Sequence, residues 1–209
     1  MSDLTGEAER SRAAKLALRS HLLTVRRSLT PSARRLAAAQ LQDQTLSFVR
    51  REHPSTIAAY VPVGPEPGGP DLPARLAATG ARVLLPVLLG DNDLDWAVFT
   101  GDLTPGPRGL LEPTGPRLGV EALGSADLIL VPALAVDRSG RRMGRGGGSY
   151  DRALTRATAP VVALLHDNEL IETVPAEPHD RPVHGVITPG TGFVVLASAE
   201  VWSGRNDLR

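Results

Sequence analysis

The chain has 209 residues, of which 42% are hydrophobic, so it can bury a core of its own and is not intrinsically disordered. It contains no cysteine, which excludes disulfides, cysteine-bound metals and thiol nucleophiles. Its formal net charge of zero argues against non-specific nucleic-acid binding, and no nucleic-acid partner is expected.

The first two helices are predicted from apolar spacing and capping residues. Residues 1–12 are polar and are expected to fray, and residues 13–29 repeat leucine and valine at helical intervals. Thr30 and Pro31 suit the N-cap and first position of a second helix that runs to about Arg51. The arginine pairs on these helices, including Arg26-Arg27, are expected to face solvent.

After these helices, short apolar segments alternate with short helical ones. The expected strands are 56–63, 82–88, 94–100, 127–135, 160–166, 183–188 and 193–196. The expected helices are 70–79 and 148–158, and 105–117 is expected to be a loop. This alternation predicts one α/β domain over 1–209: a three-layer fold with a mostly parallel sheet, helices on both faces, and a preceding N-terminal helix pair.

No apolar run approaches the roughly 20 residues of a membrane helix. The charged N-terminus also lacks the apolar segment of a secretory signal. We therefore expect a cytoplasmic monomer with no membrane partner. Lys15 is the only lysine among 23 basic residues. Composition leaves two explanations open for it: chance survival, or a position that requires a compact ammonium instead of a planar guanidinium.

A glycine-rich segment after the expected strand 127–135 carries the clearest chemical signal. Between Arg141 and Arg152, four glycines occupy five positions, at Gly144, Gly146, Gly147 and Gly148. Successive exposed backbone N–H groups at the start of a helix bind phosphate, and the neighbouring arginines add positive charge. The segment is neither a Walker A loop nor a dinucleotide-binding fingerprint. Three arginines within five residues favour anion binding over a flexible turn.

The segment from Asp137 to Asp151 resembles the central motif of the 5-formyltetrahydrofolate cyclo-ligase family, with Met143 and Ser149 as departures. Lys15-Leu16-Ala17-Leu18-Arg19 matches the family's N-terminal motif, and the resemblance extends from about Ala13 to Thr188. It implies a Rossmann-like cyclo-ligase fold and an enzyme that uses ATP and Mg²⁺.

The resemblance also implies the site residues. ATP contacts would come from Lys15, Leu16, Ala17, Leu18, Arg19, Arg142, Met143, Gly144, Arg145, Gly146, Gly147, Gly148, Ser149 and Tyr150. Substrate contacts would come from Val61, Glu66, Gly146, Gly147 and Gly148, and metal contacts from Asp151 and Asp180. Lys15, Arg142 and Arg145 would neutralise the transferring phosphate. Taken alone, Glu66 would be interpreted as a solvated turn residue and Lys15–Arg19 as an ordinary helix turn. Glu112 is expected to anchor a loop.

The reaction implied by the resemblance converts 5-formyltetrahydrofolate and ATP to 5,10-methenyltetrahydrofolate, ADP and phosphate. Three alternatives remain open at this point. The chain could be a non-catalytic relative that binds nucleotide or RNA, a phosphosugar isomerase or acyltransferase on a similar sheet, or a kinase for a small alcohol.

Overall fold

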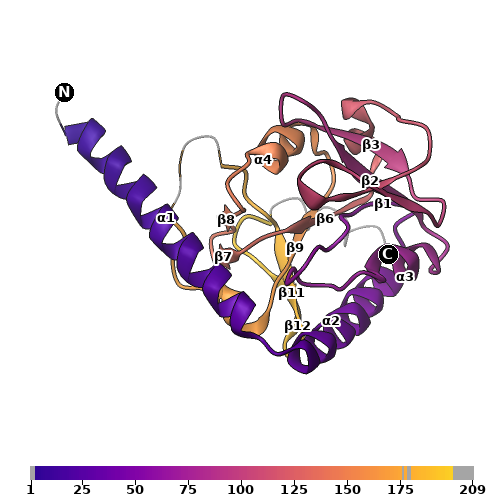
Figure 1. Ribbon diagram of the computed structural model, residues 1–209, viewed down its shortest axis with the longest axis horizontal. Helices are drawn as coiled ribbons and strands as arrows, with labels where there is room; N and C mark the ends of the chain where they lie inside the picture. Colours follow the sequence, from indigo (N-terminus) through magenta and orange to yellow (C-terminus); the bar gives the residue numbers. More distant parts are fainter. Residues whose placement is uncertain (1–2, 176, 178–179, 200–209) are drawn as a thin grey trace.

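The computed structural model describes residues 3–175, 177 and 180–199 (Figure 1). Their main sheet has seven strands in the order β12-β11-β9-β6-β1-β2-β3. The bounds are β1 Thr56–Ala58, β2 Arg82–Leu88, β3 Leu94–Val98, β6 Leu128–Pro132, β9 Val161–Leu164, β11 Gly185–Thr188 and β12 Gly192–Val195. The central strands β11, β9, β6, β1 and β2 run parallel, and only the edge strands β3 and β12 are antiparallel. The expected mostly parallel sheet is therefore confirmed.

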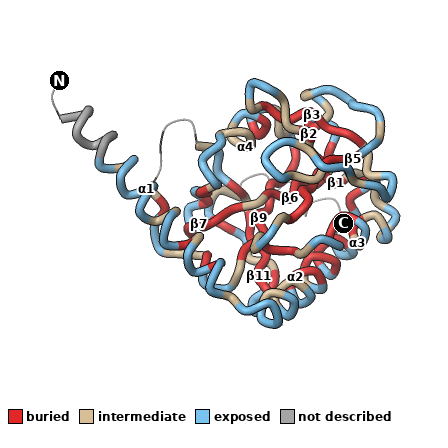
Figure 2. Tube along the Cα trace, in the orientation of Figure 1, coloured by how far each residue is buried: buried red, intermediate tan, exposed pale blue. Residues whose placement is uncertain are grey.

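Alternate residues of each strand enter two different cores. Ile57 of β1 packs beneath α2 (Pro31–Glu52), and α3 (Leu72–Ala77) covers the same face. Ala58 faces the opposite core, which is covered by α4 (Ser149–Ala153) and two 3-10 helices, η2 (Val120–Ser125) and η3 (Leu154–Arg156). Helices thus lie on both faces, as predicted, and Figure 2 shows the buried strands between the more exposed outer elements.

The first helix is placed differently from the second. α1 (Asp3–Ser28) packs its Leu22 against a small sheet of β10, β7 and β8. The bounds of these strands are β7 Ala135–Asp137, β8 Arg142–Met143 and β10 Leu170–Ile171. A last 3-10 helix, η4 (Asp167–Glu169), leads into β10. The N-terminal half of α1 projects from the body in Figure 1. The helix begins at Asp3, so the expected start at residue 13 is wrong.

Three other expectations are corrected. The strand expected over 127–135 ends at Pro132, because the chain then leaves the main sheet and Leu134 N–H donates to Met143 in the small one. The helix expected over 148–158 is the five-residue α4, which continues as η3 because its later bonds span three residues. The loop expected over 105–117 is instead largely part of a hairpin, in which β4 (Leu103–Pro105) and β5 (Leu111–Pro113) are joined through the 3-10 helix η1 (Pro107–Gly109).

The strand expected over 56–63 pairs only as far as Ala58, where both of its ladders end. Residues 59–61 continue in buried, extended form, and the chain then turns at Gly64, whose φ is +58°. β1 lies between β6 and β2. The chain passes from β1 to β2 on one side of β1, and it later returns to form β6 on the other side. Such a switch point opens a crevice at the carboxyl ends of the strands, where α/β proteins bind ligands.

Candidate active site

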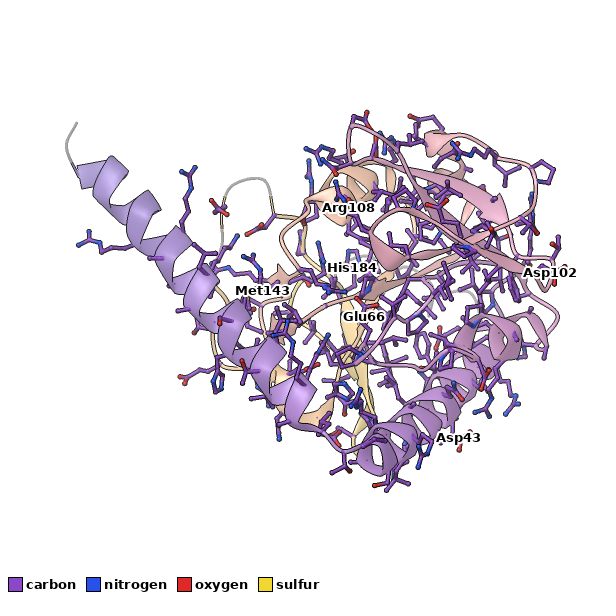
Figure 3. The ribbon with its side chains drawn as sticks, viewed as in Figure 1. Asp43, Glu66, Asp102, Arg108, Met143 and His184 are labelled. Carbon is purple, nitrogen blue, oxygen red and sulfur yellow. The ribbon has the colours of Figure 1, made fainter. Side chains whose placement is uncertain are left out.

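A cavity of about 470 Å³ occupies this crevice. Its floor is formed where β6, β1 and β2 end, at Pro132, Tyr60 and Leu88. The glycine-rich loop and three residues of α1 border it on one side, and residues of β3, η1 and β5 border it on the other. In Figure 3, Met143 lies next to α1, and Glu66 and Arg108 lie on the side of Met143 away from α1.

Asp137 fixes the start of the glycine-rich loop. Its carboxylate accepts hydrogen bonds from Ser139 N–H at 2.9 Å, Ser139 Oγ at 2.6 Å and Val174 N–H at 3.0 Å. Burial alone would raise the pKa of Asp137, but these hydrogen bonds outweigh it and lower the pKa below its ordinary value. An ionised carboxylate thus anchors the turn from β7 to β8, and the loop leaves the small sheet where β8 ends at Met143.

The loop requires glycine because arginine side chains pass close to its backbone. A Cβ atom at Gly144 would lie 2.9 Å from Arg142 Nη1, and one at Gly146 would lie 3.3 Å from Arg19 Cζ. Gly146 and Gly148 also have φ values of +100° and +70°, which favour glycine. Arg19 donates to the Gly144 carbonyl at 3.2 Å and so ties α1 to the loop.

Arg142 is buried beneath the loop, with its side chain 2% exposed. Its guanidinium donates to Asp151 at 2.8 Å and to the Pro132 carbonyl at 3.2 Å. Among the described residues, neither its Nε nor the buried hydroxyl of Tyr150 has a hydrogen-bond acceptor. Burial, with a smaller effect of Glu66, raises the pKa of Tyr150, so its hydroxyl stays protonated. Both groups are buried donors, and an anionic ligand would supply the missing acceptors.

Lys15 reaches the cavity from α1. Its ammonium contacts Asp180 at 2.6 Å and Glu177 at 2.9 Å, and its side chain is 8% exposed. A buried, paired ammonium favours the interpretation that this position requires lysine over chance survival of a solvated one. Asp180 also accepts from the Glu177 N–H at 2.7 Å, so the two acidic residues that bind Lys15 are bonded to each other.

Glu66 and Arg145 meet across the cavity. Arg145 Nη1 lies 3.2 Å from Glu66 Oε1, and the other carboxylate oxygen accepts from Val63 N–H at 3.0 Å. The Glu66 side chain is only 10% exposed, whereas that of Arg145 is 56% exposed. Glu66 is thus a buried carboxylate held by its own turn, and the solvated-turn interpretation is wrong.

Most of the predicted site residues line this cavity. Exceptions are Leu16, Ala17 and Leu18 of α1, because Leu16 and Ala17 face outward and Leu18 packs toward the small sheet. Met143 is buried against α1, so an apolar residue suits it, and Ser149 opens α4 at the cavity wall. The sequence analysis did not assign four other residues to the site that also line the cavity: Arg26, Tyr60, Arg108 and Glu177.

Arg26 corrects one expectation. Instead of facing solvent it is 2% exposed, and it binds Glu169 of η4 through both Nε (2.6 Å) and Nη2 (2.8 Å). It also donates to the Ala133 carbonyl. Glu112 behaves as expected, because its buried carboxylate accepts from Leu88 N–H at 2.9 Å and anchors β5 to the end of β2.

The acidic residues of the cavity allow a test of the expected metal. No group of three His, Cys, Asp or Glu side chains within the described part of the chain could hold a metal ion. A Mg²⁺ ion that arrives with nucleotide phosphates needs only one or two carboxylates. Asp151 and Asp180 both line the cavity, and the Arg181 N–H next to Asp180 lies 3.4 Å from Asp151. The donors therefore fit a phosphate-borne Mg²⁺ ion.

A mostly parallel sheet with a glycine- and arginine-bordered cavity at its switch point defines an α/β protein with a candidate site for an anionic ligand. The chain matches the 5-formyltetrahydrofolate cyclo-ligase family over residues 11–189. A 5-formyltetrahydrofolate cyclo-ligase of Mycolicibacterium smegmatis is 47% identical over 190 residues, covering 87% of this chain and 97% of that protein. One of Escherichia coli is 30% identical over 172 residues, covering 78% and 94%.

The fold comparison agrees. The solved structure of an Aquifex aeolicus 5,10-methenyltetrahydrofolate synthetase superposes with a TM-score of 0.74 at 26% identity, covering 88% of this chain and 93% of that one. The chain belongs to the 5-formyltetrahydrofolate cyclo-ligase family, and it is an enzyme of the ligase class. Within the described residues, no helix combines the length and apolar character needed to cross a membrane.

Proposed function

We propose that the enzyme converts 5-formyltetrahydrofolate to 5,10-methenyltetrahydrofolate and couples the ring closure to hydrolysis of ATP to ADP and phosphate. The observation that carries this proposal is the Arg145–Glu66 contact at 3.2 Å. It joins the loop expected to bind phosphate to the carboxylate expected to bind the pterin, so one cavity can hold both substrates.

Glu66 is the proposed pterin ligand. A carboxylate can accept paired hydrogen bonds from the N–H groups of an aminopyrimidine edge, and the Val63 N–H bond already orients this one. Val61 follows the end of β1 and supplies an apolar contact beside it. Gly146, Gly147 and Gly148 let the substrate approach the loop backbone closely, because they carry no side chain.

The nucleotide is assigned to the loop and to α1. Backbone N–H groups between Met143 and Tyr150 can donate to phosphate oxygens, and the unpaired Nε of Arg142 adds a buried donor. Arg19 places a further guanidinium against the loop. Lys15, Arg142 and Arg145 neutralise the charge on the transferring phosphoryl group. In this proposal Asp151 and Asp180 hold the Mg²⁺ ion, which screens phosphate charge when bound.

The chemistry needs positioning more than acid–base catalysis. The formyl oxygen is a poor leaving group, and transfer of the γ-phosphoryl group to it creates a good one. The N10 amine then attacks the formyl carbon and loses its proton, the carbon–oxygen bond breaks, and phosphate leaves with that proton. Phosphoryl transfer depends mainly on alignment and charge neutralisation, which Lys15, Arg142, Arg145 and the glycine loop supply in this proposal.

The test follows the near-ultraviolet absorbance of the conjugated methenyl cation. Purified enzyme with 5-formyltetrahydrofolate should develop this band only when ATP and Mg²⁺ are both present. Arg145→Ala should lose most of this activity while remaining folded, and Arg138→Ala, an exposed arginine outside the cavity, should keep it. A flat trace from folded protein that binds ATP would overturn the proposal.

A further inference from the structure

The cations of the cavity fall into two groups. Lys15, Arg142, Arg145 and Arg26 each form an ion pair with a carboxylate. Arg19 and Arg108 line the same cavity but form no ion pair with any described residue. Arg19 lies against the glycine-rich loop, where phosphate is expected. Arg108 is thus the one unpaired cation among the described cavity residues that the proposed nucleotide site does not account for.

Arg108 lies at the end of the cavity away from α1 and from Met143, where the phosphate loop begins; the last part of that segment, α4, reaches across and packs on β3. The strand order β6-β1-β2-β3 gives the direction across the cavity. After β6 the chain passes through β7 and β8 of the small sheet and then forms the loop. Glu66 comes after β1, and Leu88 of β2 pairs with Leu94 of β3 at the β2–β3 turn. At about 4.8 Å per strand spacing, the distance from β6 to β3 is about 14 Å. Arg108 belongs to η1, at the β2–β3 end.

The walls of this end are apolar. Pro86 and Leu88 come from β2, Leu94 from β3, and Leu110 and Leu111 from the hairpin that carries Arg108. The nearby carboxylates already have partners. Asp93 pairs with Arg156, which lowers the pKa of Asp93, and Glu112 accepts from Leu88 N–H. Arg108 therefore places a positive charge beside an apolar slot that offers it no carboxylate.

The side chain of Arg108 is held in place by an unusual backbone. Arg108 has φ +58° and ψ +23°, one of three non-glycine residues with positive φ in the described chain. Another is Asn92, in the β2–β3 turn, and Arg108 Nη2 donates to its Oδ1 at 2.6 Å. Left-handed backbone at non-glycine residues costs free energy, and such residues cluster at ligand sites. Two such residues are bonded together here, and their hydrogen bond joins two hairpins at the cavity mouth.

We propose that Arg108 binds a carboxylate of the substrate's glutamate tail, with the aminobenzoyl ring lying in the apolar slot beside it. This inference rests on the proposed function. Phosphoryl transfer places the reacting formyl group near the loop, so the remainder of the substrate extends toward β2 and β3. A flat ring followed by an anionic tail matches an apolar slot followed by an arginine. Arg108 is thus a specificity-determining residue that acts on binding and not on the chemical step.

The test compares 5-formyltetrahydrofolate with 5-formyltetrahydropteroate, which lacks the glutamate. The informative variant is Arg108→Gly, because glycine accepts the positive φ and removes the side chain without strain. The wild-type enzyme should prefer the glutamate-containing substrate by about tenfold in kcat/KM, the size of one solvent-accessible charged contact. In Arg108→Gly this ratio should fall to about one, with kcat and the KM for ATP unchanged, and Arg108→Lys should restore part of it.

Arg117→Ala is the matched control, since Arg117 is exposed, follows the same hairpin and does not line the cavity. It should leave the substrate ratio unchanged. The inference is overturned if Arg108→Gly keeps the wild-type ratio, or if it lowers activity on both substrates equally. Dissociation constants from calorimetry give the same ratio without turnover. Failure of the wild-type enzyme to convert either substrate would instead overturn the proposed function, while the calorimetric ratio would still test Arg108.

Discussion

The first two helices of the chain have similar lengths and opposite tasks. α2 lies along the main sheet, where Leu41, Leu46, Phe48 and Val49 are nearly inaccessible. α1 contributes only Leu22 among its described side chains to the buried apolar clusters, and much of its surface is exposed in Figure 2. Its buried polar residues Lys15 and Arg26 both line the cavity. α2 therefore builds the scaffold, whereas α1 delivers charge to the site.

This difference shows how a helix with little apolar burial is held in position. Arg26 binds Glu169 and the Ala133 carbonyl. Lys15 binds Glu177 and Asp180, and Arg19 binds the loop at Gly144. Each of these contacts is also part of the cavity wall or adjoins it. The position of α1 is thus coupled to the site, and changes in α1 should affect activity before stability.

The largest effect is expected from Lys15→Met, which keeps the length of the side chain and removes its charge. Loss of one charge directed at the transferring phosphate should lower kcat/KM by about 100- to 1,000-fold. Thermal stability should fall by less than activity, because Leu22 and the Arg26–Glu169 pair still hold α1 in place. Steady-state kinetics and calorimetry measure the two effects. Lys15→Arg tests the need for a compact ammonium, and full activity in that variant would contradict it.

Leu41→Ala on α2 should show the reverse pattern. Leu41 is 1% exposed in the core beneath α2, so removing its side chain leaves a cavity that costs about 3 kcal/mol of unfolding free energy. The kcat of the remaining folded enzyme should be unchanged, because Leu41 does not line the active-site cavity. Denaturant unfolding and kinetics at low temperature give both quantities. A fall in kcat without a loss of stability would show that α2 also shapes the site.

The glycine-rich loop was predictable because its chemistry is local. Glycines, arginines and the anchoring Asp137 lie within a short segment, and positive φ and close approach are properties that sequence reveals. Lys15 lies at the cavity, where the family motif predicted it, whereas its being the only lysine had left two explanations open. The buried strands were found because short apolar runs between turns leave few alternatives, although their ends depended on pairing.

The predictions that the structure corrects have a common physical cause: each feature depends on residues that are far away in the sequence. Arg26 was expected to face solvent, because its partner Glu169 is 143 residues away in the sequence and nothing near Arg26 indicates the pair. Arg108 lies in a segment whose prolines and glycines resemble an ordinary loop, and its importance appears only when the hairpin folds beside β2. The length of α4 and the break after Pro132 depend on the small sheet, which forms from segments far apart in the chain.

The smallest effect concerns His184, which belongs to the scaffold and does not line the cavity. Its Nδ1 accepts from Val161 N–H at 2.9 Å, and burial lowers its pKa below the ordinary value of 6.5. The unfolded chain therefore binds this proton more readily than the folded protein. The associated stability is fully present above pH 6.5 and is lost as the pH falls through the folded pKa.

His184→Gln keeps an acceptor for Val161 and cannot titrate, so unfolding free energies of both proteins should diverge below pH 6.5, with the wild type losing more. One proton sets an upper limit of about 1.4 kcal/mol per pH unit on this divergence. Asp93 and Asp137 also have pKa values lowered from 3.8, so their protonation affects stability only at a lower pH. Both proteins contain these residues, so the effect is the same in each. Parallel curves between pH 8 and pH 5 would contradict the prediction. Substrate KM values should follow the same pH course in both proteins, because the titrating group lies in the scaffold and not in the site that α1 completes.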